Sequence, residues 1–175
     1  MRKRDIVIGT MVLLALGAAT VGGSATDGPC GFAPYPPCKM AENACLLLRA
    51  EDVSAVSGQS WKQQGSGPMR PLAGAPLIND CQYDGPTEDE DAEIRVHDGG
   101  RAQFDETVFK LLGGLTAVSG VGDAAYKTSG RSNVAEMWVI KGGTFFSVTL
   151  HTDNPSIGSW VVVLARKIAD RIKTK

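Results

Sequence analysis

Hydrophobic and polar residues alternate along the middle of the chain. The alternation is clearest between residues 92 and 97, where it puts His97 on the polar side. A period of two is that of a strand with one buried face and one face in water. We therefore predict a strand here with His97 exposed, and a second strand over 78–83, joined by the acidic connection 84–91.

Two more strands are predicted near the end of the chain, over 134–141 and 144–152. Gly142 and Gly143 lie between them, and a pair of glycines favours a two-residue hairpin turn because both central positions need a positive φ. A shorter strand over 123–128 is predicted to precede this hairpin.

Apolar residues spaced three and four apart predict three helices. The first runs to Ser57 from Glu42 or Ala50, two starts that the pattern leaves open. The second covers 101–112, and the third begins at the Asp-Asn-Pro sequence 153–155, which suits a helix start. The apolar stripe of the third helix consists of Ile157, Trp160, Val161, Leu164, Ile168 and Ile172.

The order of these elements predicts the fold class. A short strand over 60–64 and a loop over 65–76 follow the first helix, and hairpins connect most of the later strands. The chain is therefore expected to be α+β, with an antiparallel sheet of about five to six strands and helices packed mainly on one face.

The first residues have the pattern of an export signal. A basic cap at residues 2–4 precedes an apolar run of eleven residues, 6–16, and small residues follow. Eleven residues match a signal-peptide core and fall short of the roughly 20 that span a bilayer. Cleavage is expected after Ala25, or alternatively after Ala19, and an uncleaved anchor over 6–25 is the other interpretation.

Three segments follow from this pattern. Residues 1–25 are the export signal or anchor, 26–40 form an arm rich in proline and cysteine, and 41–175 form a single α+β domain. Beyond residue 25 the chain has 15 Lys and Arg against 18 Asp and Glu, a net charge of −3. No basic stripe is present, so nucleic acid is not expected as a partner. The expected location is the periplasm, the cell envelope or the exterior.

The four cysteines are Cys30, Cys38, Cys45 and Cys81. Export takes thiols into an oxidising environment, where they pair. None of them forms a C-x-x-C motif, so neither a zinc site nor a thioredoxin-like redox site is expected. Of the three possible pairings we expect Cys30–Cys38, which closes a proline-containing loop, and Cys45–Cys81, which joins the first helix to a strand.

No residue pattern indicates a bound metal or cofactor. Gly120, Gly122 and Asp123 match G-x-G-x-x-A, but a dinucleotide loop needs a strand before it and a helix after it, whereas a strand is expected to follow here. We expect a tight turn instead, in which Asp123 accepts hydrogen bonds from backbone amides. The acidic run 88–91 lacks the alternating ligands and the glycine of a calcium loop, and is expected to be a solvated hairpin tip.

No catalytic residue is predicted. His97 and His151 are the only histidines, and the alternation puts both at strand ends on the polar side. The nucleophile elbow G-x-S-x-G of many hydrolases does not occur in the sequence.

Several short motifs follow one another in a familiar order. They are Cys45-Leu46-Leu47-Leu48 before a helix that ends at Gly58, Cys81-Gln82-Tyr83, Val118-Ser119-Gly120-Val121-Gly122-Asp123-Ala124-Ala125-Tyr126, and Val139-Ile140-Lys141-Gly142-Gly143. In this order they resemble a family of small exported envelope proteins of unknown function, common as lipoproteins in actinobacteria. The resemblance implies an α+β fold, a location in the cell envelope and no catalytic residues to transfer. The chain departs from that family because it lacks the lipid-attachment cysteine and adds Cys30 and Cys38.

These expectations predict an exported cell-envelope protein that acts as a non-enzymatic binding module for an unknown envelope protein or small ligand. The membrane would be contacted only through an uncleaved N-terminal segment. Two alternatives stay open: an exported hydrolase with a site near His97 or His151, and a structural accessory subunit of an envelope complex. A deep cleft that converges on a histidine would favour the enzyme.

Overall fold

The structure is a computed structural model, and it describes residues 43–69, 78–111, 114–128 and 132–173. The elements in chain order are α1 (Ala44–Leu47), α2 (Ala50–Ser57), β1 (Lys62–Met69), β2 (Ile78–Asp84), β3 (Asp91–His97), α3 (Gly100–Leu111), β4 (Leu115–Ala117), β5 (Ala124–Thr128), β6 (Val134–Lys141), β7 (Thr144–His151) and α4 (Ile157–Arg171).

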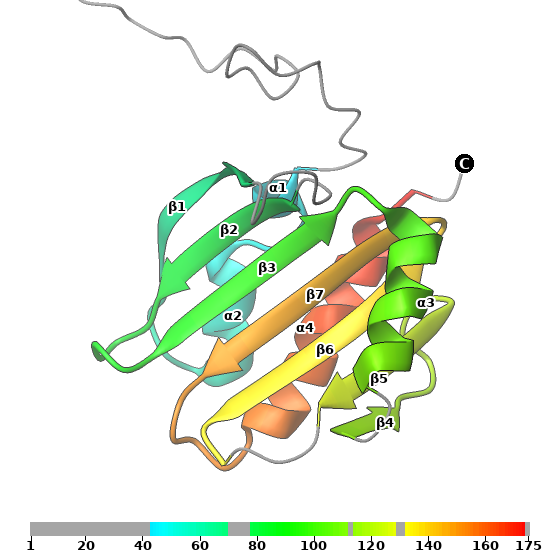
Figure 1. The fold of residues 1–175 in the computed structure, drawn as a ribbon. Coiled ribbons are helices and arrows are strands. Elements are labelled where there is room, and N and C mark those ends of the chain that lie inside the picture. The colour runs from blue at the N-terminus through cyan, green and yellow to red at the C-terminus, as the bar shows by residue number, and fades with distance from the viewer. Residues whose placement is uncertain (1–42, 70–77, 112–113, 129–131, 174–175) are drawn as a thin grey trace, which may run out of the picture.

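All seven described strands belong to one antiparallel sheet in the order β1-β2-β3-β7-β6-β5-β4 (Figure 1). The predicted α+β class and antiparallel sheet are therefore confirmed, with more strands than the five to six expected. The additional strand is β4, whose three residues are too few to show an alternation in the sequence.

One face of the sheet carries the main core. Alternate side chains of the central strands, such as Ile94, Val148 and Met137, are completely buried on this face. The helices α2 and α4 lie behind it in Figure 1, and the predicted apolar stripe of α4, including Val161 and Leu164, is buried against it. Burying each such side chain stabilises the fold by about 1.5–3 kcal/mol.

The helix α3 packs on the opposite face and covers only one end of it, over β6 and β7 (Figure 1). Its side chains Phe104 and Val108 form a second, smaller core with Ile140 and Phe145. His97 lies next to this core and is only 8 % exposed. The prediction that His97 faces water is therefore wrong, because alternation predicts the face of a residue but not whether a helix covers that face.

The strand register arranges the residues of this second face in rows that cross the sheet. The row nearest α3 is Ile78, His97, Phe145, Ile140 and Ala124, and the next is Asp80, Arg95, Ser147, Trp138 and Tyr126. The third row is Gln82, Glu93, Thr149 and Glu136, and the fourth is Asp84, Asp91, His151 and Val134. The face thus changes from largely apolar under α3 to acidic at the hairpin between β2 and β3.

The predicted disulfide between Cys45 and Cys81 is present and joins α1 to β2, with an S–S distance of 2.05 Å. Such a bond indicates an oxidising, extracytoplasmic setting. The expected pair Cys30–Cys38 lies outside the described residues, as do the segments 1–25 and 26–40. No helix in the described part of the chain is both long and apolar enough to span a membrane.

The start of the first predicted helix is Ala50, because two extended residues, Leu48 and Arg49, separate α2 from the four-residue helix α1. Leu48 is fully buried, and its carbonyl oxygen accepts a hydrogen bond from the hydroxyl of Tyr83 at 2.5 Å. The helix α2 ends at Gly58, which adopts φ 72°. This left-handed conformation suits glycine at a helix end.

Two predicted boundaries differ from the structure. The strand β1 continues to Met69 where a loop from residue 65 is predicted, because Gly65 and Gly67 pair with β2 through their backbones despite a composition that favours turns. The helix α4 begins at Ile157 rather than at 153–155, since the Asn154 side chain accepts a hydrogen bond from the Ser156 backbone in a turn before the helix.

Candidate functional site

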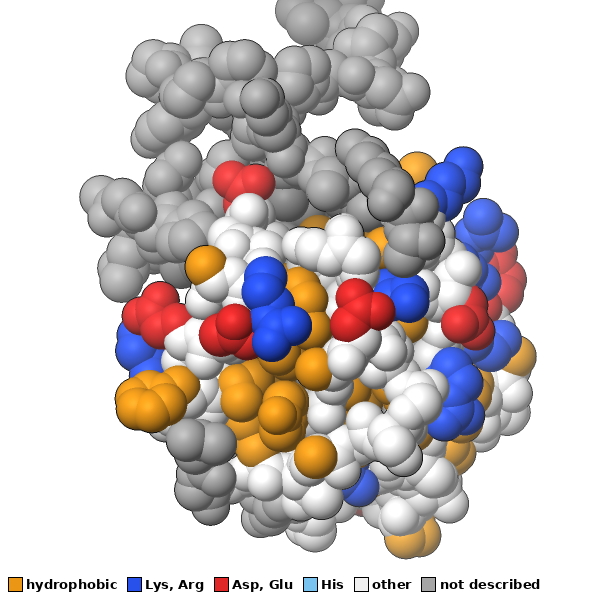
Figure 2. Space-filling view, turned by 90° about the vertical axis from the view of Figure 1, so that its right-hand side faces the viewer, with side chains coloured by type: hydrophobic (Ala, Val, Ile, Leu, Met, Phe, Trp, Pro, Cys, Tyr) orange, Lys and Arg blue, Asp and Glu red, His pale blue; other side chains and the backbone are white. Residues whose placement is uncertain are grey.

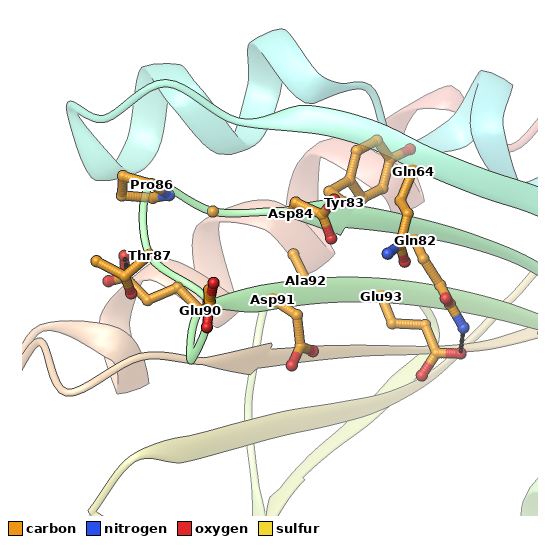
Figure 3. A pocket seen from close by; sticks show the side chains of 12 residues that line it. Gln64, Gln82, Tyr83, Asp84, Pro86, Thr87, Glu90, Asp91, Ala92 and Glu93 are labelled. Atoms are coloured by element: carbon orange, nitrogen blue, oxygen red, sulfur yellow. Dashed lines mark hydrogen bonds between the residues drawn. The ribbon is translucent and has the colours of Figure 1, made fainter.

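A hollow of about 640 Å³ lies beside the hairpin that connects β2 to β3. Its wall carries five carboxylates and no lysine or arginine: Asp84, Glu88, Glu90, Asp91 and Glu93. Figure 3 shows these strands with the side chains of Gln64, Asp84, Glu90, Asp91 and Glu93 around the space. A hollow of this size can hold a small molecule or the side chains of a peptide.

The shape of the hairpin depends on Gly85. Its backbone N–H donates to the carbonyl oxygen of Glu90 at 2.8 Å, which closes the turn. A Cβ atom at position 85 would lie 2.5 Å from the Glu90 Cβ and 3.2 Å from the buried ring of Trp61. A glycine is therefore needed for the close approach that brings the acidic residues of both strands around the hollow.

Three of the carboxylates have partners at the rim. Glu90 accepts hydrogen bonds from the hydroxyls of Thr152 at 2.6 Å and Thr87 at 3.2 Å. Asp91 lies 2.9 Å from Nδ1 of His151, and Glu93 pairs with Arg95 at 2.7 Å. These contacts hold the side chains in place and leave the hollow with an excess of negative charge.

The side-chain carboxylates of Asp84 and Glu88 are exposed and have no hydrogen-bond or ion-pair partner within the described part of the chain. A carboxylate that has no hydrogen bond or ion pair to break is well suited to pair with a cation of a ligand.

The sheet face next to the hollow is also rich in carboxyl groups. Burial raises the pKa of Asp80, and the negative charge of Glu93 raises it further. Burial likewise raises the pKa of Glu136, which a hydrogen bond from Thr149 partly opposes. Burial thus disfavours an uncompensated charge at both carboxyl groups, and the negative charge of Glu93 adds to the shift in each case.

Among the residues that the structure describes, no three His, Cys, Asp or Glu side chains form a group able to hold a metal ion. The acidic residues 88–91 lie in the turn between β2 and β3 and at the first residue of β3.

Compared with known proteins, the chain matches no family model and no curated sequence. The site must therefore be interpreted from its own chemistry.

The two histidines occupy different environments and belong to different clusters. Nε2 of His97 lies 3.3 Å from the hydroxyl of Ser147, but Ser147 is only 2 % exposed and Nδ1 of His97 has no hydrogen-bond partner among the described residues. His151 is partly exposed and its contact is Asp91. A hydrolase triad needs an accessible nucleophile, a base and an orienting group in one chain of hydrogen bonds. Neither histidine has this arrangement, and neither lines the hollow.

The glycine turn and the hairpin turn contact each other. Gly120 and Gly122 adopt φ 71° and 60°, and Asp123 accepts a hydrogen bond from the backbone N–H of Gly142 at 2.7 Å. This bond, together with the ammonium group of Lys141, lowers the pKa of Asp123. The contact joins two turns of the backbone and does not face the hollow.

The hollow itself is not predicted by the sequence. The sequence shows the acidic run 84–91, and its charge is the one feature of the sequence that points to this part of the molecule. A run of like charges is also typical of a solvated turn. The position of these charges around the hollow depends on the pairing of β1 with β2 and of β2 with β3.

Proposed function

We propose that this protein is a non-enzymatic binding module of the cell envelope, and that the acidic hollow holds positively charged groups of its ligand. The observation that carries the proposal is a hollow of about 640 Å³ lined by five carboxylates and by no cationic side chain. Amines and guanidinium groups form charge-assisted hydrogen bonds with carboxylates, so a basic peptide segment fits this chemistry best.

Two further observations support the proposal. Asp84 and Glu88 have no competing partner among the described residues, and the rim contacts of Glu90 keep the other side of the hollow ordered. A preformed site binds with a smaller loss of conformational entropy than a mobile one. The disulfide, the N-terminal sequence pattern and the resemblance to exported proteins favour the envelope as the place of action.

The proposal is tested by titrating the protein with a pentalysine peptide at low and at physiological salt. We expect saturable binding that weakens as salt rises, because the Debye length falls to about 8 Å at 0.15 M. Binding should be absent for pentaglutamate. The NMR signals that shift should belong to the hairpin around Gly85 and to the ends of β2 and β3.

The double variant Asp84→Asn/Glu88→Gln removes the two uncompensated charges and keeps the side-chain shapes. Two ion pairs of about 0.5–1 kcal/mol each correspond to a loss of affinity of about tenfold. The matched control is Asp98→Asn/Asp153→Asn, which removes two exposed carboxylates that do not line the hollow. Equal losses in the two double variants would mean that only the overall charge matters, and the hollow would not be the site.

A further inference from the structure

The strand β1 forms one edge of the sheet and part of the wall of the acidic hollow. It pairs with β2 on one side, and no described strand pairs with its other side. Residues 62–65 are exposed, and Gln64 lines the hollow (Figure 3). Alternate residues of an edge strand direct their backbone N–H and C=O groups away from the sheet, where an added strand can pair with them.

A β-bulge in this strand lies beside the hollow. Gln63 pairs with Tyr83 and Gly65 pairs with Gln82, so Gln64 is an extra residue between two consecutive positions of β2. Bulges at sheet edges change the direction in which a side chain points, and they are frequent next to functional sites. Here the extra residue contributes its side chain to the wall of the hollow, together with Gln82.

Two glycines leave the adjoining part of β1 without side chains on the same face. Gly65 lies across from Gln82 and Gly67 across from Asp80, and residues directly opposite each other share a face of the sheet. A Cβ atom at either glycine would meet no atom within 4 Å, so packing does not require a glycine at these positions. Their effect is to keep a path open from the edge of the sheet to the hollow.

The charges around the hollow favour a basic strand at this edge. Five carboxylates line the hollow, and the one cation of β1 is Lys62 at its first residue. The carboxylates of β2 would lie two strand spacings, about 10 Å, from an added strand. A lysine or arginine side chain that passes over Gly65 covers most of this distance and carries its charge at the far end.

The opposite edge of the sheet, at β4, lacks this charge. Figure 2 faces the side of the molecule with α3 and β4, and lysines and arginines lie there among the aspartates and glutamates. A smaller hollow of about 290 Å³ at this edge is lined by no charged side chain. Charge complementarity with a basic peptide is therefore a property of the β1 edge.

We propose that an extended basic peptide adds to the free edge of β1 as a further strand and directs alternate lysine or arginine side chains over Gly65 into the acidic hollow. This inference rests on the function proposed above and adds how the peptide is held. Backbone hydrogen bonds to β1 supply affinity, and the spacing of two between basic residues supplies specificity. Pro68 has no N–H to donate, which restricts the pairing to the half of β1 beside the hollow.

The test uses the full chain with its disulfide formed and two capped peptides of equal composition and charge. Lys-Thr-Lys-Thr-Lys places all its lysines on one face of an extended strand, whereas Lys-Lys-Lys-Thr-Thr divides them between the two faces. We expect the first peptide to bind about tenfold more tightly, because one more lysine forms a charge-assisted hydrogen bond in the hollow. Its binding should also slow the hydrogen exchange of the outward-facing amides of β1.

Backbone N-methylation of the alternating peptide tests the strand pairing itself. Successive N–H groups of an extended strand point to opposite edges, so methyl groups on the second and fourth residues block one edge, and methyl groups on the third and fifth block the other. One of these two methylated peptides should lose about tenfold in affinity, as expected for two net hydrogen bonds, and the other should bind like the unmodified peptide.

The variant Gly65→Val fills the open path from the side of the protein. It should fold normally, because the space above this position is empty, and should bind the alternating peptide about tenfold more weakly. Gly114→Val, just before β4 and equally open, is the matched control and should bind like the wild type.

Two outcomes would overturn the inference in different ways. If both lysine peptides shift the NMR signals of the hairpin around Gly85 with equal affinity and β1 exchange is unchanged, charge alone holds the peptide. The strand addition is then wrong, and the acidic hollow remains the binding site. If neither peptide shifts those signals, the proposed function itself fails together with the strand addition.

Discussion

Arg171 near the end of α4 holds Asp52 on α2 in a two-pronged ion pair across 119 positions of the chain, at 2.5 Å and 2.8 Å. Asp52 also accepts a hydrogen bond from the backbone N–H of Arg49, which caps the start of α2. Burial by itself would raise the pKa of Asp52, but the hydrogen bond and charge of Arg171 outweigh it, so the pKa lies below its ordinary value. This pair fixes the first helices of the described chain to the last one.

Asp52→Asn should lower the free energy of unfolding by about 2 kcal/mol, because it removes the charge that a partly buried guanidinium needs. Urea denaturation measures this loss. The control is Asp105→Asn, which breaks the exposed pair with Arg101 and should leave the stability nearly unchanged. Similar losses in both variants would show that the Asp52 pair contributes no more than a surface ion pair.

Acid should weaken the fold through His97. Burial lowers the pKa of His97 to about 4, helped by the nearby charge of Arg95, whereas an unfolded histidine titrates near 6.5. Between pH 6.5 and pH 4 the unfolded state binds a proton at His97 more strongly than the folded state does. The free energy of unfolding is therefore unaffected by His97 above pH 6.5 and decreases as the pH falls to 4. The loss should total about 3 kcal/mol.

Denaturation curves at several pH values between 7 and 4.5 give this dependence directly. His97→Gln should flatten the slope of stability against pH between pH 6.5 and 5. A wild-type slope unaffected by His97→Gln would contradict the assignment.

Reducing or removing the disulfide should destabilise the protein. The bond joins residues 36 positions apart, and closing a loop of that length in the unfolded chain corresponds to about 4 kcal/mol in the loop-entropy treatment. The double variant Cys45→Ala/Cys81→Ala should therefore unfold at much lower urea concentration. A reducing agent should destabilise the wild type and leave this double variant unaffected, which separates the cross-link from any effect of the new side chains.

Gly122→Ala should be far more harmful than Gly120→Ala. Both glycines have positive φ, which costs an alanine about 1 kcal/mol. A Cβ at position 122 would in addition lie 2.6 Å from the carbonyl oxygen of Ile140, whereas nothing lies within 4 Å at position 120. We expect Gly122→Ala to lower the free energy of unfolding by more than about 2 kcal/mol, measured by thermal unfolding. Equal losses would mean that the backbone angle alone matters at both positions.

Local patterns in the sequence were sufficient for much of the fold. The glycine pair at 142–143 and its flanking strands, the stripe of α4 and the α+β class all follow from periodicities that act over a few residues. The partnership of Cys45 with Cys81 could also be predicted, since few pairings are possible. The strand β4 and the end of β1 at Met69 could not be predicted, because they form by backbone pairing with a neighbouring strand despite their composition.

The sequence by itself determined which residues share a face of each strand and helix, since that depends only on the repeat of the element to which they belong. Tertiary structure alone decided what lies over each face. In the folded chain His97 is buried beside α3, acidic residues of β2 and β3 line a hollow, and Arg171 pairs with Asp52. These features depend on contacts between segments far apart in the chain, and no local periodicity encodes such contacts.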